Sequence, residues 1–187
     1  MRKLLFAIVL CLALPLTSPV SAQTPPSTAE APSPSAAILT IPTPAAWEEK
    51  TLTPDDYRTK AFVNPQTESS IEVFSKKLEH VELANSLFTS FDHQLISISF
   101  EKNATATAEM TFTLKDETKV SGVWNEYAYT NRDIRINTVT FTFTLQDYAF
   151  IIVGYFSPAE RETGIDVLKS LIKSIEPQSV ADAPTAP

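Results

Sequence analysis

The chain has 187 residues, a formal net charge of −7 and a single cysteine, Cys11. An acidic chain is repelled by nucleic acid and by anionic lipid headgroups, and no cluster of basic residues reverses this locally. Neither nucleic acid nor a charged membrane surface is therefore expected as a partner.

The first 22 residues have the three parts of a secretory signal peptide. Arg2 and Lys3 form a basic head, residues 4–14 are an apolar run of eleven residues, and Val20-Ser21-Ala22 supplies the small residues before a cleavage site. The run is well short of the ~20 residues that cross a bilayer, which argues against an uncleaved anchor. We predict cleavage after Ala22 and a periplasmic or secreted chain with no stable membrane anchor.

Cys11 raises one alternative, a lipoprotein. Lipid attachment needs a small residue before the cysteine, whereas Leu10 precedes Cys11 within the apolar run. We therefore interpret Cys11 as part of the signal peptide, and its removal leaves no thiolate nucleophile or thiolate metal ligand. Cleavage also removes two of the 15 basic residues, which leaves 13 against 22 acidic ones and a formal charge of −9.

The placement of proline marks the domain boundaries. Residues 23–37 are rich in Pro, Ser, Thr and Ala, and residues 178–187 have the same character. Such segments bury too little apolar surface to offset chain entropy, so we expect a disordered tether and a disordered tail. One domain, residues 38–177, is expected between them, and about 140 residues can bury roughly two-thirds of their unfolded surface.

Four short elements open this domain. They are predicted strands at residues 38–41, 57–63 and 70–75 and a predicted helix at residues 80–91. Pro42 ends the first strand, and Trp47 follows in a turn. Residues 64–67, with the sequence Asn-Pro-Gln-Thr, have turn composition, so the next two strands form a hairpin. Apolar residues then recur at helical spacing and predict one buried stripe.

The middle of the domain is strongly β. Strands are predicted at residues 95–100, 104–114, 119–129 and 138–145. Two of them, 104–114 and 138–145, set apolar residues on one face and mostly threonine on the other. Alternation of this kind is typical of antiparallel strands with a single well-covered face.

A strand and a helix close the domain. Residues 148–156 follow a predicted turn at Gln146-Asp147, and the run from Phe150 to Val153 is apolar on both faces, which indicates a central strand. Ser157-Pro158-Ala159-Glu160 then predicts a capping box, in which the Ser157 hydroxyl accepts from the N–H of Glu160 and Glu160 reaches back. Apolar residues follow at helical spacing, and Pro177 ends the helix.

The order of these elements carries a resemblance. A strand that ends at Ile41-Pro42 is followed by Trp47, a hairpin with an Asn-Pro turn, a helix and an antiparallel meander. The strand at 148–156 then runs into a helix that finishes Leu171-Ile172-Lys173-Ser174-Ile175. This order, over about residues 41–175, is similar to the Mog1/PsbP-like fold of the PsbP and DcrB-like secreted proteins. The resemblance implies an α+β fold in which helices flank an antiparallel sheet, an α/β/α sandwich, and a binding or assembly role.

The residues themselves offer no catalytic constellation. His80 and His93 lie thirteen residues apart, about 20 Å along a helix, which is too far to share a zinc ion. Neither a GxSxG elbow nor a glycine-rich phosphate loop is present. The acid pairs Glu48-Glu49 and Asp55-Asp56 fit solvated loops, and an ion held by Asp92 with His93 has no support in the spacing. We expect no enzyme, no cofactor and no metal.

The segment 124–133 is the best candidate for a binding surface. It sets Trp124, Tyr127 and Tyr129 beside amides and the charged Arg132. Aromatic residues and arginine dominate binding hot spots at protein interfaces. We predict that these four residues border a partner surface; the alternative is that Trp124 or the tyrosines fill the core beneath a helix.

These observations favour one function over two alternatives. The chain is expected to be a secreted, non-catalytic binding or assembly module of the bacterial cell envelope, with an envelope protein as its partner. The first alternative is a small-ligand or metal-binding periplasmic protein, which a bound metal or a deep apolar cavity would favour. The second is a hydrolase, which a convergent Ser/His/acid cluster would favour.

Overall fold

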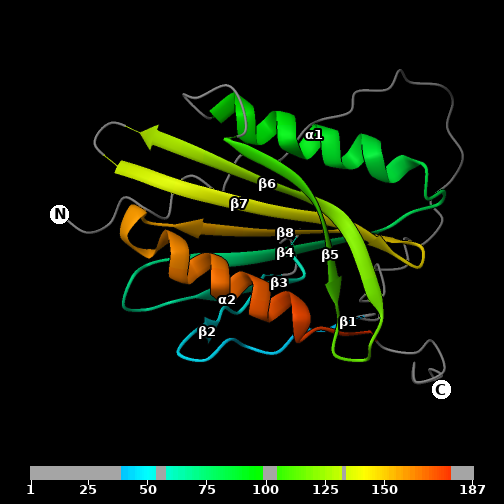
Figure 1. Ribbon diagram of the computed structural model, residues 1–187, viewed down its shortest axis with the longest axis horizontal. Helices are drawn as coiled ribbons and strands as arrows, with labels where there is room; N and C mark the ends of the chain where they lie inside the picture. The colour runs from blue at the N-terminus through cyan, green and yellow to red at the C-terminus, as the bar shows by residue number, and fades with distance from the viewer. Residues whose placement is uncertain (1–38, 54–57, 99–104, 132–133, 178–187) are drawn as a thin grey trace, which may run out of the picture. The chain divides into compact units, whose positions relative to one another are not determined.

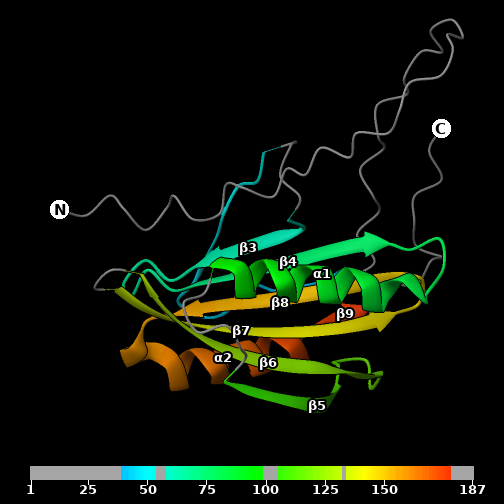
Figure 2. The same ribbon diagram turned by 90° about the horizontal axis from the view of Figure 1, so that it is seen from above.

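The computed structural model describes residues 39–53, 58–98, 105–131 and 134–177. The predicted signal peptide, tether and tail lie outside these residues, as do Asp55-Asp56, Tyr57 and Arg132. In the described part, a seven-stranded antiparallel sheet with the strand order β2-β3-β4-β8-β7-β6-β5 carries two α-helices (Figures 1 and 2). The predicted α+β class, an antiparallel sheet flanked by helices, is confirmed.

The elements follow one another as short strands, a helix, an antiparallel meander and a last helix. Their bounds are β1 Leu39–Thr40, β2 Glu48–Glu49, β3 Lys60–Val63, β4 Ser70–Lys77, α1 Leu83–Ile98, β5 Ala106–Thr113, β6 Lys119–Asn131, β7 Ile134–Leu145, β8 Tyr148–Phe156, the 3₁₀ turn η2 Pro158–Glu160, α2 Arg161–Lys173 and β9 Glu176–Pro177. Neither of the two described α-helices has the length and apolar character needed to span a membrane.

Local turn chemistry sets the hairpins. β3 and β4 pair antiparallel around the turn at residues 64–67, where the N–H of Asn64 donates to the carbonyl of Ser69 over 2.9 Å. Gln146 and Asp147 form the turn between β7 and β8, and Gln146 has a φ of 55°. Both hairpins predicted from the sequence are confirmed.

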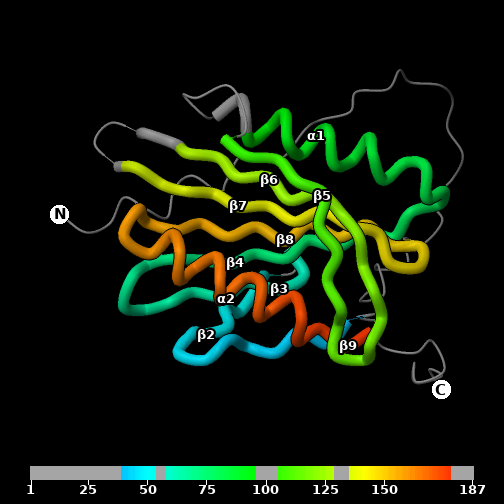
Figure 3. The backbone as a smooth tube through the Cα atoms, viewed as in Figure 1, coloured from blue at the N-terminus to red at the C-terminus, as the bar shows by residue number. Residues whose placement is uncertain are grey.

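A smaller sheet joins the two ends of the described domain. β1 pairs antiparallel with β9, and Leu39 lies opposite Pro177 (Figure 3). Trp47 follows β1, and its N–H donates to the carbonyl of Pro44 over 3.1 Å, which confirms the predicted turn. The Trp47 side chain is buried in the main core, so the chain before β2 is held by apolar packing as well as by this pairing.

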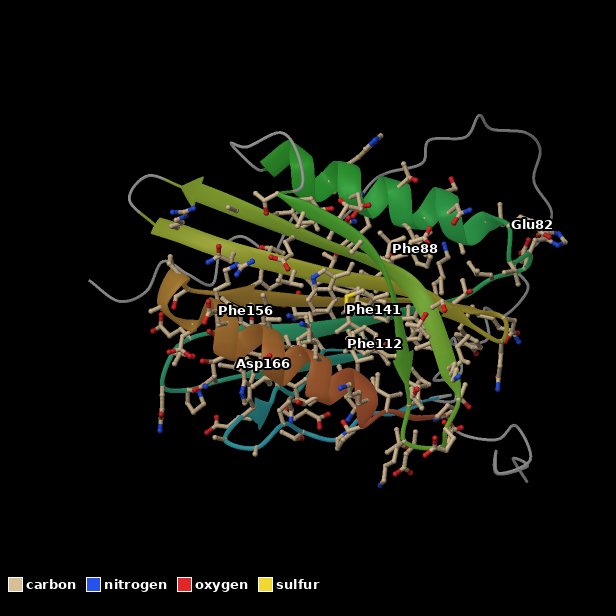
Figure 4. The ribbon with its side chains drawn as sticks, in the orientation of Figure 1. Glu82, Phe88, Phe112, Phe141, Phe156 and Asp166 are labelled. Carbon is tan, nitrogen blue, oxygen red and sulfur yellow. The ribbon has the colours of Figure 1, made fainter. Side chains whose placement is uncertain are left out.

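The face of the sheet that packs on α2 holds the main apolar core. Successive strand residues point to opposite faces, and on this face Phe141 of β7 lies opposite Ile152 of β8. The ring of Phe112 from β5 meets Phe141 edge-on, with centroids 4.9 Å apart (Figure 4). α2 closes this core with four buried apolar side chains, which are Ile165, Leu168, Leu171 and Ile172.

Two glycines make room for a ring between β8 and α2. The buried Phe156 lies so close to both elements that a Cβ on Gly154 would be 2.4 Å from its ring and a Cβ on Gly164 would be 2.3 Å away. Both distances are shorter than 3.0 Å, the shortest approach that a Cβ atom normally makes to another heavy atom. The close approach of the last helix to the central strand therefore depends on the absence of side chains at these two positions.

The start of the last helix differs from the prediction. Residues 158–160 form the 3₁₀ turn η2, and α2 begins at Arg161. Ser157 occupies the N-cap position, but its side chain makes no capping hydrogen bond; the N–H of Glu160 donates to the Ser157 backbone carbonyl over 3.0 Å. The predicted capping box is wrong, because the tighter turn satisfies the same N–H from the main chain.

α1 is longer than predicted and replaces a predicted strand. The helix begins at Leu83, three residues later than predicted, and continues to Ile98. The strand predicted over residues 95–100 is therefore wrong as far as Ile98, beyond which its residues lie outside the described part. Leu95 follows Phe91 by four residues and extends the apolar stripe of the helix, which packs with the sheet.

β7 is covered on both faces, against the prediction of a single covered face. Thr138 and Thr140 are 0% exposed and Thr142 is 3% exposed. β6 and β8 flank β7 in the sheet, and α1 packs on the threonine side, where Ile136 and Leu95 belong to one cluster. The hydroxyls of Thr138 and Thr140 have no hydrogen-bond partner in the described part of the chain. This face is thus a buried layer that mixes apolar and polar groups.

Candidate functional site

β6 divides the predicted binding segment between the two faces of the sheet. Trp124 lies opposite Phe141 of β7 and shares its face with Glu126, which is the face covered by α2. Asn125 and Tyr127 point to the other face, on which α1 packs. Trp124 and Tyr127 therefore do not form one surface, because residues an odd number of positions apart in a strand point in opposite directions.

On the α2 face, Trp124 is the centre of a cluster that ties β6 to the last helix. Its indole is 4% exposed, and Nε1–H donates to Oε1 of Glu126 over 3.0 Å. Arg161 at the start of α2 forms an ion pair with the other oxygen of Glu126. Nζ of Lys169 lies 5.6 Å from the centroid of the Trp124 ring, within range of a cation–π interaction.

On the α1 face, the carboxylate of Asp92 in α1 accepts hydrogen bonds from two side chains of β6. Tyr127 is a buried residue, 2% exposed, and its hydroxyl donates to Oδ1 of Asp92 over 2.8 Å. The side-chain amide of Asn125, also buried, donates to Oδ2 of the same carboxylate over 3.3 Å. Hydrogen bonds to an ionised acceptor are stronger than neutral ones, so Asp92 fixes the position of α1 on the sheet.

A second carboxylate is buried on the same face further along the sheet. Glu72 of β4 accepts from Nη1 of Arg58 over 2.7 Å, and the Glu72 side chain is only 5% exposed. A buried charge of this kind is tolerated only when it is paired. Arg58 therefore holds the start of β3 against β4.

The other two predicted residues lie toward the end of the β6–β7 hairpin. The backbone of Tyr129 pairs with Ile136 of β7. Arg132 follows the end of β6 and lies outside the described residues. That Trp124, Tyr127, Tyr129 and Arg132 border a partner surface stays a prediction.

Sequence reasoning missed the residues that position this segment. Asp92 lies 35 residues before Tyr127, and Arg161 lies 35 residues after Glu126. No spacing rule joins positions this far apart, and the sequence showed Asp92 only as a neighbour of His93. Glu126 could have been noticed, because its place two residues after Trp124 puts both on one face of a strand.

The described surface includes two open depressions. One, of about 420 Å³, lies between the end of β4 and the first half of α1 and is lined by residues that include Lys77, Leu78 and Leu83. The other, of about 450 Å³, lies between residues 42–45 and the outer side of α2, including Val167. Neither lining contains histidine. Among the residues that the structure describes, no three His, Cys, Asp or Glu side chains gather as a metal site would require.

No known family model matches the sequence, and no curated protein matches it. Solved structures do match. LpqN of Mycobacterium tuberculosis, described as involved in cell envelope biogenesis, superposes with a TM-score of 0.52 and 11% identity, over 75% of this chain and 83% of LpqN. CyanoP, the PsbP of Synechocystis sp. PCC 6803, superposes with a TM-score of 0.51 and 8% identity, over 75% of this chain and 87% of CyanoP.

A protein from Bacteroides thetaiotaomicron matches with a TM-score of 0.52 and 8% identity, over 78% of this chain but only 47% of that protein. Identities this low establish the fold and nothing further. The chain has the Mog1/PsbP-like fold, which confirms the resemblance inferred from the order of its elements.

Proposed function

We propose that this chain is a non-catalytic binding or assembly module of the bacterial cell envelope. The observation that carries the proposal is the match to LpqN, a protein described as involved in cell envelope biogenesis, over most of both chains. The signal peptide predicted at residues 1–22 supports the same location, because it would deliver the domain to the periplasm or beyond.

The hydrogen bonds and ion pairs of three carboxylates, Asp92, Glu126 and Glu72, support binding over catalysis. Asp92 accepts from two β6 side chains, Glu126 accepts from Trp124 and pairs with Arg161, and Glu72 pairs with Arg58. A general base must be within hydrogen-bond reach of the proton that it abstracts, whereas the oxygens of these carboxylates bond to side chains of the protein itself. Asp92 and Glu126 are suited to fixing the position of β6 and of the two helices, and Glu72 to fixing the start of β3.

The proposed partner surface lies at the end of the β6–β7 hairpin, at Tyr129 and Arg132. Trp124 and Tyr127 anchor the strand from opposite faces of the sheet, the first to α2 and the second to α1. These contacts hold β6 at Trp124 and Tyr127 before a partner binds, and a preorganised strand loses less conformational entropy on binding, which favours affinity. The partner proposed is a protein of the cell envelope.

The location is tested by purifying the protein from a bacterial culture that expresses the full chain. We expect it in the periplasmic or extracellular fraction, with Gln23 as the first residue in N-terminal sequencing. A cytoplasmic protein that still begins at Met1, or one that carries a lipid on Cys11, would contradict the proposed location.

The surface is tested by the double variant Tyr129→Ala/Arg132→Ala in a pull-down from envelope extract. The matched control is Tyr148→Ala/Lys77→Ala, which also removes one tyrosine and one cation but acts at the β7–β8 end of the sheet. We expect the first variant to lose the partner and the control to keep it, with both folded by circular dichroism. An unchanged partner for the folded first variant would remove this surface from the proposal.

A further inference from the structure

The two edges of the large sheet differ in a way that bears on self-association. β2 forms one edge and is only two residues long, and both of them are glutamate. β5 forms the other edge, is eight residues long, and is exposed along most of its length. Figure 2 shows β5 as the outermost strand on its side of the sheet, and no described strand pairs with its outer edge between Ala106 and Thr113. Just beyond this stretch, the N–H of Lys115 donates to the carbonyl of Ile175 over 3.1 Å, so the open part of the edge ends there.

β5 lacks the devices that usually protect an edge strand. Natural edges carry proline, lysine, bulges or very short strands, which prevent pairing with another chain. β5 has the sequence Ala-Thr-Ala-Glu-Met-Thr-Phe-Thr, with no proline and no lysine, and Glu109 is its single charge. It pairs with β6 residue for residue from Ala106 to Thr113, with no bulge between these residues; only at its start does Thr105 also donate to the carbonyl of Glu126, which lies opposite Ala106.

The pairing with β6 shows which backbone groups of β5 face outward. The N–H of Leu114 donates to the carbonyl of Thr118 over 2.8 Å, so the directly opposed pair 114–118 is a hydrogen-bonded one. Such pairs alternate along an antiparallel ladder, so Phe112, Met110 and Ala108 also bond to β6. The N–H and carbonyl groups of the residues between them point away from the sheet; these are Thr107, Glu109, Thr111 and Thr113.

We propose that β5 pairs antiparallel with β5 of a second copy of this chain, with the two-fold axis at Met110. In this register Glu109 lies opposite Thr111 of the partner subunit, so no like charges are directly opposed. Phe112 lies opposite Ala108 of the partner subunit, and a large side chain meets a small one on the α2 face. A register centred on Glu109 would set two carboxylates against each other, which is unfavourable.

The difference between the edges makes the assembly a closed dimer. An isologous pairing uses the same strand of both copies and leaves β2 as the edge at each end. Because β2 is short and doubly acidic, the combined sheet does not grow further. One strand from each copy is a small interface, so the dimer is weak and its population depends on protein concentration.

The central experiment compares Thr111→Pro with Thr111→Ala in protein purified from cells that express the full chain. The Thr111 N–H points outward, so proline removes an intermolecular donor and leaves the ladder to β6 in place. Both variants lose the hydrogen bond between the Thr111 and Ser121 hydroxyls, which makes alanine the matched control. Sedimentation velocity over a wide range of concentrations measures the dimer in each.

We expect the wild-type chain and Thr111→Ala to dimerise alike and Thr111→Pro to raise the dissociation constant by about tenfold or more, because two symmetric hydrogen bonds are lost. Hydrogen exchange should slow at the amides of Glu109 and Thr111 as concentration rises. A wild-type chain that stays monomeric at every concentration, or a folded Thr111→Pro that still dimerises fully, overturns the proposal. If Thr111→Pro unfolds, Ala108→Lys tests the same pairing. It places a charge opposite Phe112 of the partner subunit in the proposed register and leaves the backbone unchanged.

Discussion

β7 and β5 have the same type of sequence and opposite surroundings. Both alternate threonine with apolar residues, as in Thr-Val-Thr-Phe-Thr-Phe-Thr for β7 and Thr-Ala-Glu-Met-Thr-Phe-Thr for β5. β7 lies between β6 and β8, and its threonines at 138, 140 and 142 are buried on the face where α1 packs. β5 has a neighbour on one side only, and its threonines at 107, 111 and 113 are exposed.

The comparison shows that alternation of polar and apolar residues indicates a strand but does not indicate whether the polar face is exposed to solvent. The period of two reports the pleat of a strand, because successive side chains point to opposite faces. It does not report whether the polar face meets water. In β7 the polar face became part of the interior, and the cost of burying hydroxyls is visible at Thr138 and Thr140, whose oxygens have no described hydrogen-bond partner.

The largest expected contrast is in the apolar residues of the two strands. Phe141 of β7 is fully buried and packs against the rings of Phe112 and Phe143, whereas Met110 of β5 is only partly buried. We expect Phe141→Ala to lower the free energy of unfolding by about 3–5 kcal/mol and Met110→Ala by no more than about 2 kcal/mol. Urea denaturation with linear extrapolation measures both. Equal losses would mean that β5 is as well packed as β7.

The second contrast is between carboxylates near these strands. Asp92→Ala removes the acceptor of two buried donors, the Tyr127 hydroxyl and the Asn125 amide, and we expect it to lower the free energy of unfolding by about 1–3 kcal/mol. Glu109→Ala removes an exposed carboxylate of β5 and should change it by less than about 0.5 kcal/mol. Denaturation curves of both variants give the comparison, and a negligible effect of Asp92→Ala would show that α1 is held by its apolar stripe alone.

The smallest expected effect is a gain in stability, not a loss. Thr140→Val replaces a buried hydroxyl that has no described partner with a methyl group of similar shape, so we expect the free energy of unfolding to rise by about 1 kcal/mol. Thr111→Val replaces an exposed hydroxyl bonded to Ser121 and should stay within about 0.5 kcal/mol of the wild type. Thermal denaturation of matched samples resolves the sign. A destabilised Thr140→Val would indicate that an ordered water satisfies this hydroxyl.

The last helix and α1 show where local patterns sufficed and where they did not. The apolar spacing from Ile165 to Ile172 predicted the buried face of α2, since a helix face is fixed by period alone. The apolar spacing predicted that the first helix ends at residue 91 and that a strand follows from residue 95, whereas α1 continues to Ile98. Residues 95–98 fit the pattern of a strand as well as that of a helix. Leu95 packs with Tyr127 of β6, and this contact extends the helix.

Local sequence patterns identified the candidate binding segment but not the residues that hold it in place. The segment from Trp124 to Tyr127 was identified by composition, and its strand conformation was predicted correctly. Its division between two faces also follows from the period of a strand. Its partners Asp92 and Arg161 come from helices on opposite sides of the sheet, and only the tertiary structure brings them together.

The sequence by itself determined the order and type of most elements, both hairpin turns and the resemblance to the Mog1/PsbP-like fold, because these depend on periods and turn residues a few positions apart. The apolar run Phe150–Val153 also indicated correctly that β8 is a central strand. The tertiary structure alone decided that β7 lies inside the sheet and that β5 lies at its edge. That choice depends on pairings such as β4 with β8, whose residues are about 80 positions apart and carry no local signal. For this reason two strands of nearly the same composition became a buried centre and an open edge.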